Sequence, residues 1–409
     1  MIECDVLVVG AGPAGSSAAR AAARGGAKTV FIDKKKEVGI PVQCAEGIGK
    51  YLFPYLPFKI PKHLLKWKID GISLWAEDIT IERTGGIWSG YSINRDEFDK
   101  WLAEEAVKSG AKLMLETELV DIDIREDFNV TKVMVKTQKG IKKIMPKVII
   151  AADGVDSTIL KLLGFDLNLE RYAGYVIGYK MKNLKLKNPN YYQVYLGDFA
   201  PGAYAYIFPK SYTSANLGIG AIFFDKKLED CYEEFINLPV IKEQIYDGVV
   251  VENRSGWAPI RYPVTDLNYG NILLTGDAAN QNIKPFIEGI LPAIICGDLA
   301  GKTSWKFIYN KEPLTNYIKS IRDTLGFFYK ESDSLIDVLY RLGKFPDSRG
   351  HLIRLGLFSN IFSISDINKL VEYDYYTIKN NLLNYNSNRM RKFMNNLIER
   401  LAILYAKIR

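Results

Sequence analysis

Three apolar runs in the chain each end in a turn that contains glycine or aspartate. They are residues 6–9 before Gly10-Ala11-Gly12-Pro13-Ala14-Gly15, residues 148–152 before Asp153-Gly154, and residues 272–274 before Thr275-Gly276-Asp277. Short apolar runs bounded by such turns predict buried strands. After the first turn, a segment of small residues leads to a second apolar run that ends at Asp33. This order predicts a β–α–β unit.

The pattern changes along the rest of the chain. Phe98, Leu102 and Ala106 share one face of a helix predicted over 95–109. Short alternating strands are predicted over 111–152, and consecutive antiparallel strands over 170–255, including 193–196, 204–208 and 215–223. Beyond residue 302 the chain has helical periodicity and few glycines. The whole pattern predicts a mixed α/β fold with a helical C-terminal region.

The first β–α–β unit has the features of a dinucleotide site. Gly10 allows a tight turn, Gly12 lets the backbone approach a pyrophosphate, and Gly15 permits close helix–strand packing. The Asp33 carboxylate would accept hydrogen bonds from a ribose and would repel a 2′-phosphate, so the unit favours FAD or NAD over NADP. A glycine-rich turn in an ordinary loop is the alternative, but strand, helix, second strand and acid all occur here in the expected order.

The later turns complete a flavin site. Asp277, at the end of its strand, is placed to bond the ribityl hydroxyls of FAD, and the small-residue helix after it would direct N–H groups at the flavin ring. Asp153-Gly154 repeats the strand-then-turn pattern between the two. Three such motifs in this order favour FAD as the cofactor.

Composition excludes several other classes of protein. The chain has 409 residues and a formal net charge of +7, and its basic residues are spread along it without a recognised nucleic-acid-binding module. It contains no apolar run near the roughly 18 residues that span a bilayer, and no signal-peptide pattern at residue 1, so a cytoplasmic location is expected. Its four cysteines and two histidines have no metal-ligand or disulfide spacing.

Several segments together resemble the geranylgeranyl reductase family, within the flavoproteins of the para-hydroxybenzoate hydroxylase fold. They are the three turns above, residues 39–48 around Cys44, residues 91–99 with an Arg-Asp-x-Phe-Asp segment that begins at Arg95, and residues 200–210. The last segment is similar to the family's Tyr-x-Trp-x-Phe-Pro motif, with Tyr206 in the place of tryptophan. The resemblance covers about residues 1–310.

The resemblance implies a Rossmann-like FAD-binding domain formed by residues 1–60, 85–170 and 255–305. It implies an inserted antiparallel-sheet substrate domain from residues 61–84 and 171–254, and a helical region over 306–409. The residues implied to bind FAD are Gly10, Gly12, Pro13, Ala14, Gly15, Asp33, Lys34, Cys44, Ala45, Arg95, Asp153, Gly154, Gly276, Asp277, Gly289 and Ile290. Those implied to bind an isoprenoid chain are Tyr204, Tyr206, Phe208 and Pro209. From the residues alone, core packing explains the alternating aromatic side chains equally well.

The activity implied by the resemblance is saturation of double bonds in geranylgeranyl chains of archaeal-type glycerophospholipids, by hydride transfer from reduced flavin. A monooxygenase or halogenase on the same fold is an alternative, and so is a dehydrogenase that passes electrons to a quinone. A protein that binds flavin or prenyl lipid without turnover is an alternative of another class. The electron donor is open among NAD(P)H, ferredoxin and reduced deazaflavin.

One segment departs from the family pattern. After Gly-Asp-Ala-Ala the family has a proline and a run of glycines, whereas residues 285–292 read Pro-Phe-Ile-Glu-Gly-Ile-Leu-Pro and keep only Gly289 of that run. Pro292 suits the first turn of a helix, so a helix start is still predicted. How closely the backbone approaches the flavin ring is the property that this change affects.

Two further segments carry open alternatives. Cys44 is either a buried residue beside a turn or a catalytic thiol that contacts flavin or substrate, or pairs with a cysteine such as Cys296 during turnover. At the C-terminus, Met390, Met394, Leu397, Leu401, Leu404 and Ile408 form an apolar face between basic residues. That helix either packs on its own domain or makes peripheral contact with a membrane.

Overall fold

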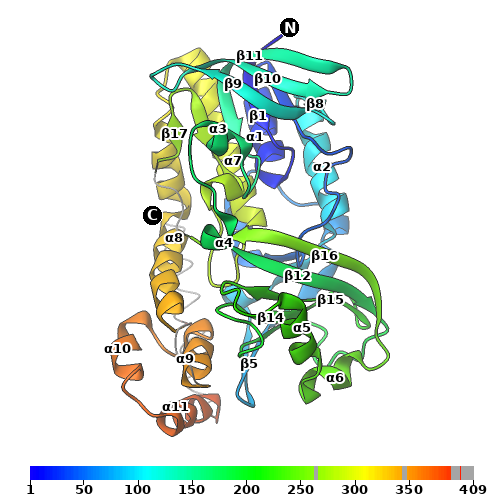
Figure 1. Ribbon diagram of the computed structural model, residues 1–409, viewed down its shortest axis with the longest axis vertical. Helices are drawn as coiled ribbons and strands as arrows, with labels where there is room; N and C mark the ends of the chain where they lie inside the picture. Colours follow the sequence, from blue (N-terminus) through cyan, green and yellow to red (C-terminus); the bar gives the residue numbers. More distant parts are fainter. Residues whose placement is uncertain (262–265, 343–347, 388–396, 398–409) are drawn as a thin grey trace.

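The computed structural model describes residues 1–261, 266–342, 348–387 and 397, and these fold around two large sheets (Figure 1). The first is eight-stranded, with the order β17-β18-β11-β1-β2-β8, and β10 and β9 extend it from β11. Its strands are β1 (Ile2–Val9), β2 (Thr29–Ile32), β8 (Lys112–Met114), β9 (Glu118–Ile124), β10 (Val130–Thr137), β11 (Gly140–Ala151), β17 (Asn268–Tyr269) and β18 (Ile272–Leu274).

The central strands of this sheet are parallel, and their ends are level. β1 pairs with β2 and β11, and β11 pairs with β18. In this register Val9 lies opposite Ala151, and Ala151 lies opposite Leu274. The three predicted turns therefore meet at one edge of the sheet, which is where open α/β sheets bind ligands.

Helices α1 (Pro13–Arg24) and α7 (Ile290–Asn310) follow two of these turns and pack against each other. Glycine allows the contact, since a Cβ at Gly297 would lie 2.1 Å from the Ala14 carbonyl oxygen and one at Gly301 would lie 2.2 Å from the Ala18 oxygen. The Ser17 hydroxyl also donates a hydrogen bond of 2.7 Å to the Ile294 carbonyl. The predicted helix start near Pro292 is confirmed, at Ile290.

Helix α2 (Arg95–Lys108) confirms the helix predicted over 95–109. Phe98, Leu102 and Ala106, the predicted apolar face, are buried. The short helices α3 (Thr158–Leu162) and α4 (Leu169–Tyr172) follow β11 and lead into the second sheet.

The second sheet has seven strands in the order β16-β12-β15-β14-β13-β5-β6. They are β5 (Gly71–Ala76), β6 (Ile79–Thr84), β12 (Ala173–Lys182), β13 (Tyr191–Tyr195), β14 (Ala205–Pro209), β15 (Ser214–Ala221) and β16 (Val249–Pro259). Neighbouring strands are antiparallel except β5 and β13. The strands predicted near 193–196, 204–208 and 215–223 are confirmed, with ends shifted by one or two residues.

Helices α5 (Leu228–Ile236) and α6 (Pro239–Ile245) cover one face of the seven-stranded sheet, where Ile177, Leu217 and Phe235 form a core. The opposite face is turned toward the eight-stranded sheet (Figure 1). A small sheet of β3 (Gly47–Gly49), β7 (Gly90–Ser92) and β4 (Trp67–Ile69) lies in the connection between the two. The 3₁₀ turns are η1 (Lys50–Tyr55), η2 (Lys62–Leu64), η3 (Gly86–Trp88), η4 (Gly276–Ala279) and η5 (Ile364–Asp366).

The C-terminal region is helical, as predicted. Its helices are α8 (Asn316–Leu342), α9 (Ser348–Phe358), α10 (Ile367–Leu370) and α11 (Tyr375–Ser387). Helix α9 packs on β5, and Leu352 and Leu355 join Leu74 and Ile81 in one core. Within the described ranges, none of the helices is long and apolar enough to cross a membrane. The amphipathic helix predicted around Met390 to Ile408 lies outside the described residues, except Leu397.

The α1–α7 contact predicts that Gly297→Ala destabilises the protein by about 2 kcal/mol, because the new Cβ meets backbone that cannot move without separating the helices. Gly326→Ala in α8 is a matched control, since its Cβ would lie an ordinary 3.4 Å from the Arg322 side chain. That control should be neutral or stabilise by up to about 1 kcal/mol. Chemical denaturation followed by circular dichroism measures both. Equal stability of the two variants would contradict the predicted role of Gly297.

Candidate functional site

A cavity of about 1290 Å³ lies between the two sheets, at the carboxyl ends of β1, β11 and β18. Pockets for a single small molecule have about 300–1,000 Å³. This cavity is therefore large enough for a dinucleotide and part of a second ligand.

The first turn forms one end of the cavity. Gly10 has φ +101°, and a Cβ there would lie 2.2 Å from the Ala152 oxygen, so only glycine fits. Gly12 caps α1 and lines the cavity, and a Cβ added to it would meet no protein atom within 4 Å. The backbone at Gly12 thus faces space that a pyrophosphate can fill, at a helix N-terminus that favours anions.

Asp33 lies beside this turn and lines the cavity. Its carboxylate oxygens accept hydrogen bonds of 2.9 Å from the backbone N–H groups of Ala11 and Lys35. These bonds hold the carboxylate in place, and a carboxylate has further lone pairs with which to accept from ribose hydroxyls. The features of this end fit FAD.

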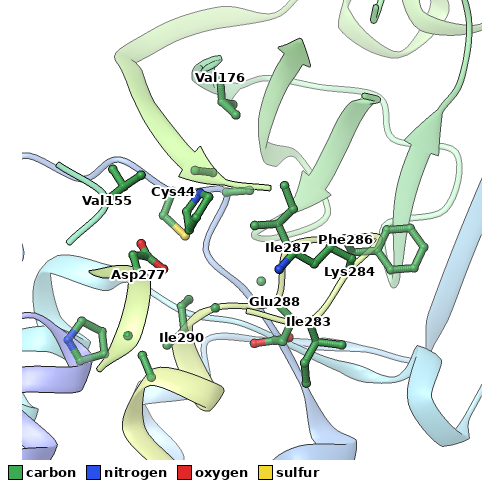
Figure 2. Close-up of a pocket in the computed structure, with 18 of the residues that line it drawn as sticks. Cys44, Val155, Val176, Asp277, Ile283, Lys284, Phe286, Ile287, Glu288 and Ile290 are labelled. Atoms are coloured by element: carbon green, nitrogen blue, oxygen red, sulfur yellow. The ribbon is translucent and has the colours of Figure 1, made fainter. Parts of the chain in front are cut away.

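The third turn lies beside the first, at the same edge of the sheet. Gly276 has φ +68° and packs on Ala14, and Asp277 follows it into the cavity. Burial raises the pKa of Asp277, while Arg95 and Lys284 act in the opposite direction. In Figure 2 the Asp277 carboxylate and the Cys44 thiol point toward each other. Hydroxyl groups of a ribityl chain are suitable partners for such a carboxylate.

Nearly all the residues predicted to bind the cofactor line this cavity. They are Gly10, Gly12, Pro13, Ala14, Asp33, Lys34, Cys44, Ala45, Arg95, Asp153, Gly154, Gly276, Asp277, Gly289 and Ile290. Gly15 does not line it, because it packs against the Gly10 carbonyl, where a Cβ would lie at 1.8 Å. The Asp153 carboxylate accepts from the Ser157 hydroxyl at 2.7 Å and the Ile159 N–H at 3.1 Å, so it supports the N-terminus of α3, where Ser157 is the N-cap.

The cavity wall on the seven-stranded sheet is aromatic. Tyr204, Tyr206 and Phe208 line it as predicted, and the Tyr204 hydroxyl donates a 2.9 Å hydrogen bond to the Phe286 carbonyl. Pro209 is not among the lining residues of the described chain; it is buried, and its carbonyl accepts a 2.6 Å hydrogen bond from the Ser92 hydroxyl. Tyr192, Trp257, Phe286, Phe358 and Phe362 also line the cavity and were not predicted.

Residues 283–288, which overlap the segment that differs from the family pattern, form a tight loop at the cavity. Ile283 and Glu288 exchange backbone hydrogen bonds of 2.9 Å, and Ile287 has φ +54°. A β-branched residue in this left-handed region is strained, by about 1–2 kcal/mol. Glycine at this position would avoid the strain, and the paired backbone bonds of Ile283 and Glu288 hold the turn in this chain.

Glu288 is the unusual group of this loop. One carboxylate oxygen accepts a 2.8 Å hydrogen bond from the Gly49 N–H, and the other is buried without a partner. Burial raises the pKa of Glu288 to about 7, against the opposing hydrogen bonds from the backbone of Gly49 and Leu291. A substantial fraction of Glu288 is therefore neutral near pH 7.

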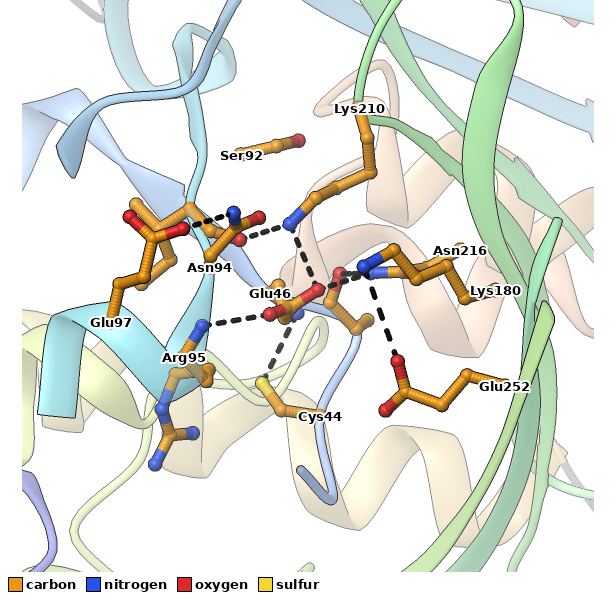
Figure 3. Close-up of polar contacts among 12 residues, drawn as sticks. Cys44, Glu46, Ser92, Asn94, Arg95, Glu97, Lys180, Lys210, Asn216 and Glu252 are labelled. Atoms are coloured by element: carbon orange, nitrogen blue, oxygen red, sulfur yellow. Dashed lines mark hydrogen bonds and ion pairs between the residues drawn. The ribbon is translucent and has the colours of Figure 1, made fainter. Parts of the chain in front are cut away.

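A buried carboxylate, Glu46, holds the segment of Cys44 against the seven-stranded sheet (Figure 3). It is 1% exposed and accepts hydrogen bonds from Lys210 at 2.8 Å, Arg254 at 2.8 Å and Asn216 at 2.9 Å. Its other oxygen accepts from the backbone N–H of Arg95 at 2.7 Å. Burial alone would raise the pKa of Glu46, but Lys210 and Arg254 outweigh it and lower the pKa to about 2.

The same network fixes Cys44. Its thiol accepts a 3.2 Å hydrogen bond from the Glu46 N–H, and its carbonyl accepts one of 3.1 Å from Arg254. Sequence reasoning placed Cys44 near the flavin but missed Glu46, Lys210 and Arg254. Lys210 lies 164 positions from Glu46 in the sequence and Arg254 lies 208 positions from it, so no local pattern connects them.

Glu46→Gln should destabilise the protein by about 3 kcal/mol, because Lys210 and Arg254 would keep their buried charges without a counter-ion. Glu97→Gln is the control, since Glu97 is a surface partner of Lys66, 45% exposed, and should cost less than about 1 kcal/mol. Because the folded pKa is about 2, the Glu46 contribution is present above the usual value of 4.5 and is lost as the pH falls toward 2. Denaturation curves at several pH values test this. A variant as stable as wild type at neutral pH would contradict it.

Glu288→Gln should change the pH dependence of stability in the opposite direction. The folded pKa is raised from 4.5 to about 7, so the folded state holds a proton that the unfolded state releases, and stability falls as pH rises through this window. The glutamine variant lacks this loss and should gain on wild type by up to about 3 kcal/mol between about pH 4 and about pH 8. Unfolding free energies at both ends of the window measure the gain. Parallel pH profiles for the two proteins would refute the assignment.

Comparison with known proteins places these features in a family. The family model described as FAD dependent oxidoreductase matches residues 5–169, and the model described as geranylgeranyl reductase catalytic domain matches residues 174–255. The two matches correspond to the dinucleotide end of the cavity and to its aromatic wall.

Curated relatives cover most of the chain. A digeranylgeranylglycerophospholipid reductase of Methanococcus aeolicus is 36% identical over 77% of this chain and 80% of its own length. One from Methanosphaera stadtmanae is 33% identical over 83% of this chain and 87% of its own length.

Solved structures agree with the sequence comparison. The crystal structure of a geranylgeranyl bacteriochlorophyll reductase-like protein from Thermoplasma acidophilum matches with a TM-score of 0.79 and 28% identity, over 94% of this chain and 99% of the other. A myxobacterial chondrochloren halogenase matches with a TM-score of 0.67 and 14% identity, over 90% of this chain and 96% of the other, which shows the shared fold alone. The chain therefore belongs to the geranylgeranyl reductase family of FAD-dependent oxidoreductases.

Proposed function

We propose that this protein saturates double bonds of geranylgeranyl chains in archaeal-type glycerophospholipids. The observation that carries the proposal is the single cavity of about 1290 Å³, in which the dinucleotide end and the aromatic wall of Tyr204, Tyr206 and Phe208 are continuous. The curated relatives named above are reductases of such lipids. Oxygen or quinone chemistry has no comparable support, because the halogenase resemblance extends to the fold only.

The aromatic wall is suited to an isolated alkene. When bound and reduced, FAD supplies a hydride for one carbon of the double bond. Such an alkene has no carbonyl group beside it to be polarised, so the protein contributes by holding chain and cofactor in alignment and by excluding water. Tyr204, Tyr206, Phe286 and Phe358 form an apolar surface that can do both.

We assign delivery of the proton to Cys44, whose thiol lies in the cavity. The two tyrosines of the wall are poorer donors, because burial raises the pKa of both Tyr204 and Tyr206. Tyr204 also directs its hydroxyl hydrogen to the Phe286 carbonyl. The thiol of Cys44 accepts a hydrogen bond from the Glu46 N–H and also interacts with the side chain of Arg95; both partners are donors, so the hydrogen of the thiol stays free to point elsewhere.

An anaerobic single-turnover experiment tests the reductase activity. The FAD-loaded protein is reduced with dithionite, mixed with digeranylgeranylglycerophospholipid in detergent, and followed by flavin absorbance and lipid mass spectrometry. We expect flavin reoxidation with a gain of two hydrogens for each double bond. Dithionite replaces the cellular donor, whether NAD(P)H, ferredoxin or reduced deazaflavin. The proposal would be overturned if the reduced flavin were not reoxidised by the lipid but reacted with oxygen or a quinone.

The same experiment tests Cys44. Loss of a general acid usually costs a factor of about 100 or more, so Cys44→Ser should slow reoxidation by at least this amount while FAD binding stays unchanged. Cys231→Ser is the matched control, because Cys231 is fully buried behind the sheet and does not line the cavity. A Cys44→Ser variant with the wild-type rate would remove Cys44 from the reaction.

A further inference from the structure

A second, smaller cavity adjoins the aromatic wall. It has a volume of about 80 Å³ and shares several lining residues with the large cavity, among them Tyr204, Tyr206 and Lys284. One water molecule needs roughly 10–15 Å³ by this kind of measure, so the smaller cavity can take a group of a few heavy atoms and no long chain. It lies next to the large cavity proposed to hold the isoprenoid chains, and it can hold only a much smaller group.

The charges around this smaller cavity all have one sign. Among the described residues that line it, only Lys284 and Arg354 carry charge, and both are cationic. The other lining residues are glycines and apolar or aromatic side chains. A cavity with two cations, apolar walls and no lining carboxylate attracts an anion.

Within the described ranges of the chain, no carboxylate acts as a counter-ion to Arg354. It is 3% exposed, its guanidinium donates to the carbonyl of Ala203 and lies 5.8 Å from the Phe358 ring, and its Nε is buried without a hydrogen-bond partner. Burial lowers its pKa to about 10, so the group is still charged at neutral pH. A buried charge without a partner is costly, by several kcal/mol.

Lys284 provides the second charge. Its ammonium donates to the carbonyl oxygens of Arg261 at 2.7 Å and Asn282 at 3.3 Å, which are neutral acceptors. Burial lowers its pKa to about 8, with Asp333 and Asp277 opposing the change. Figure 2 shows Lys284 in the loop beside Ile287 and Phe286, and it lines both cavities.

We propose that Arg354, assisted by Lys284, binds the phosphate group of the substrate. The inference rests on the proposed function, because a glycerophospholipid carries this anion next to its isoprenoid chains. Guanidinium matches phosphate oxygens with paired N–H donors, and the apolar surroundings strengthen the attraction. The smaller cavity thus holds the headgroup while the chains occupy the large cavity. Free phosphate and a prenyl diphosphate share the same chemistry.

Binding of lipids to the oxidised FAD-loaded protein tests the proposal without any turnover. Flavin fluorescence is titrated with digeranylgeranylglycerophosphate and with digeranylgeranylglycerol, which lacks the phosphate. Removing one partner of a buried charge pair costs at least about 2 kcal/mol, so Arg354→Met should weaken binding of the phosphate-bearing lipid about 30-fold and leave the neutral lipid unchanged. Arg354→Lys, which keeps the charge, should retain part of the preference. Inorganic phosphate and geranylgeranyl diphosphate serve as competitors. If they compete and the competition depends on Arg354, the site also accepts free phosphate or a prenyl diphosphate. If they do not compete, the site is restricted to the lipid headgroup.

Arg83→Met is the matched control, because Arg83 is equally buried, bonds to Tyr385 and lines neither cavity. It should not change the preference for phosphate. Without lipid, Arg354→Met should be at least as stable as wild type, since it removes a buried charge.

Three results would overturn the proposal: equal loss of both lipids, no loss of either, or a marked loss of stability in Arg354→Met. Arg354-dependent binding without flavin reoxidation would keep the phosphate site and reject the reductase activity. Flavin reoxidation together with lipid binding that does not depend on Arg354 would keep the reductase activity and reject the phosphate site.

Discussion

The buried carboxylate of Glu46 is the interaction on which the relation between the two sheets depends. It belongs to the segment that leaves the nucleotide-binding sheet, and its partners Lys210, Asn216 and Arg254 belong to the ends and strands of the other sheet. A carboxylate buried to this degree is tolerated only when its lone pairs are satisfied and its charge is balanced. The network therefore fixes one arrangement of the sheets, and with it the width of the cavity between them and the position of Cys44.

The loop over residues 283–288 shows how the site keeps its shape without the family's glycines. Ile287 adopts the left-handed conformation that glycine takes at low cost, and the mutual backbone bonds of Ile283 and Glu288 hold it there. Larger side chains then line the cavity where hydrogen atoms would otherwise face the ligand. Phe286 extends the aromatic wall, and Glu288 adds a carboxyl group whose pKa is raised to about 7. The departure from the pattern thus changes the chemistry of the wall while the helix start at Ile290 is kept.

Local pattern predicted the parts of the structure that have local causes. The sequence could predict the positions of Gly10, Gly12 and Asp33, because a tight turn, an open helix N-terminus and an acid at a strand end each need one residue type at one spacing. The face of α2 and the strands of the second sheet follow from periodicity in the same way. Pro209 was assigned to the substrate wall by motif, but side chains alternate along a strand, so Pro209 lies on the face opposite to that of Tyr206 and Phe208.

Groups that depend on distant segments could not be predicted from the sequence. Glu46 and Arg254, or Arg354 and Ala203, become neighbours only after two sheets and a C-terminal helix have packed together. Arg354 in particular lies in α9, in a helix that periodicity identifies only as partly apolar. Its significance comes from what is absent around it among the described residues, namely a carboxylate. A sequence pattern cannot show that a charged residue has no partner of opposite charge nearby in the fold.

The proposed phosphate site has a consequence for the order of the reaction. A geranylgeranyl chain carries several double bonds along its length, and an anchored headgroup sets the distance from each of them to the flavin end of the cavity. One bound position can align only one double bond with the cofactor and with Cys44, the proposed proton donor, because alignment within a fraction of an ångström decides the rate of such a step. The lipid must therefore move along the aromatic wall, or leave and return, between successive reductions. Arg354, for which the described part of the chain provides no carboxylate partner, would hold the bound phosphate in place and so favour the double bond that the anchored position brings to the flavin.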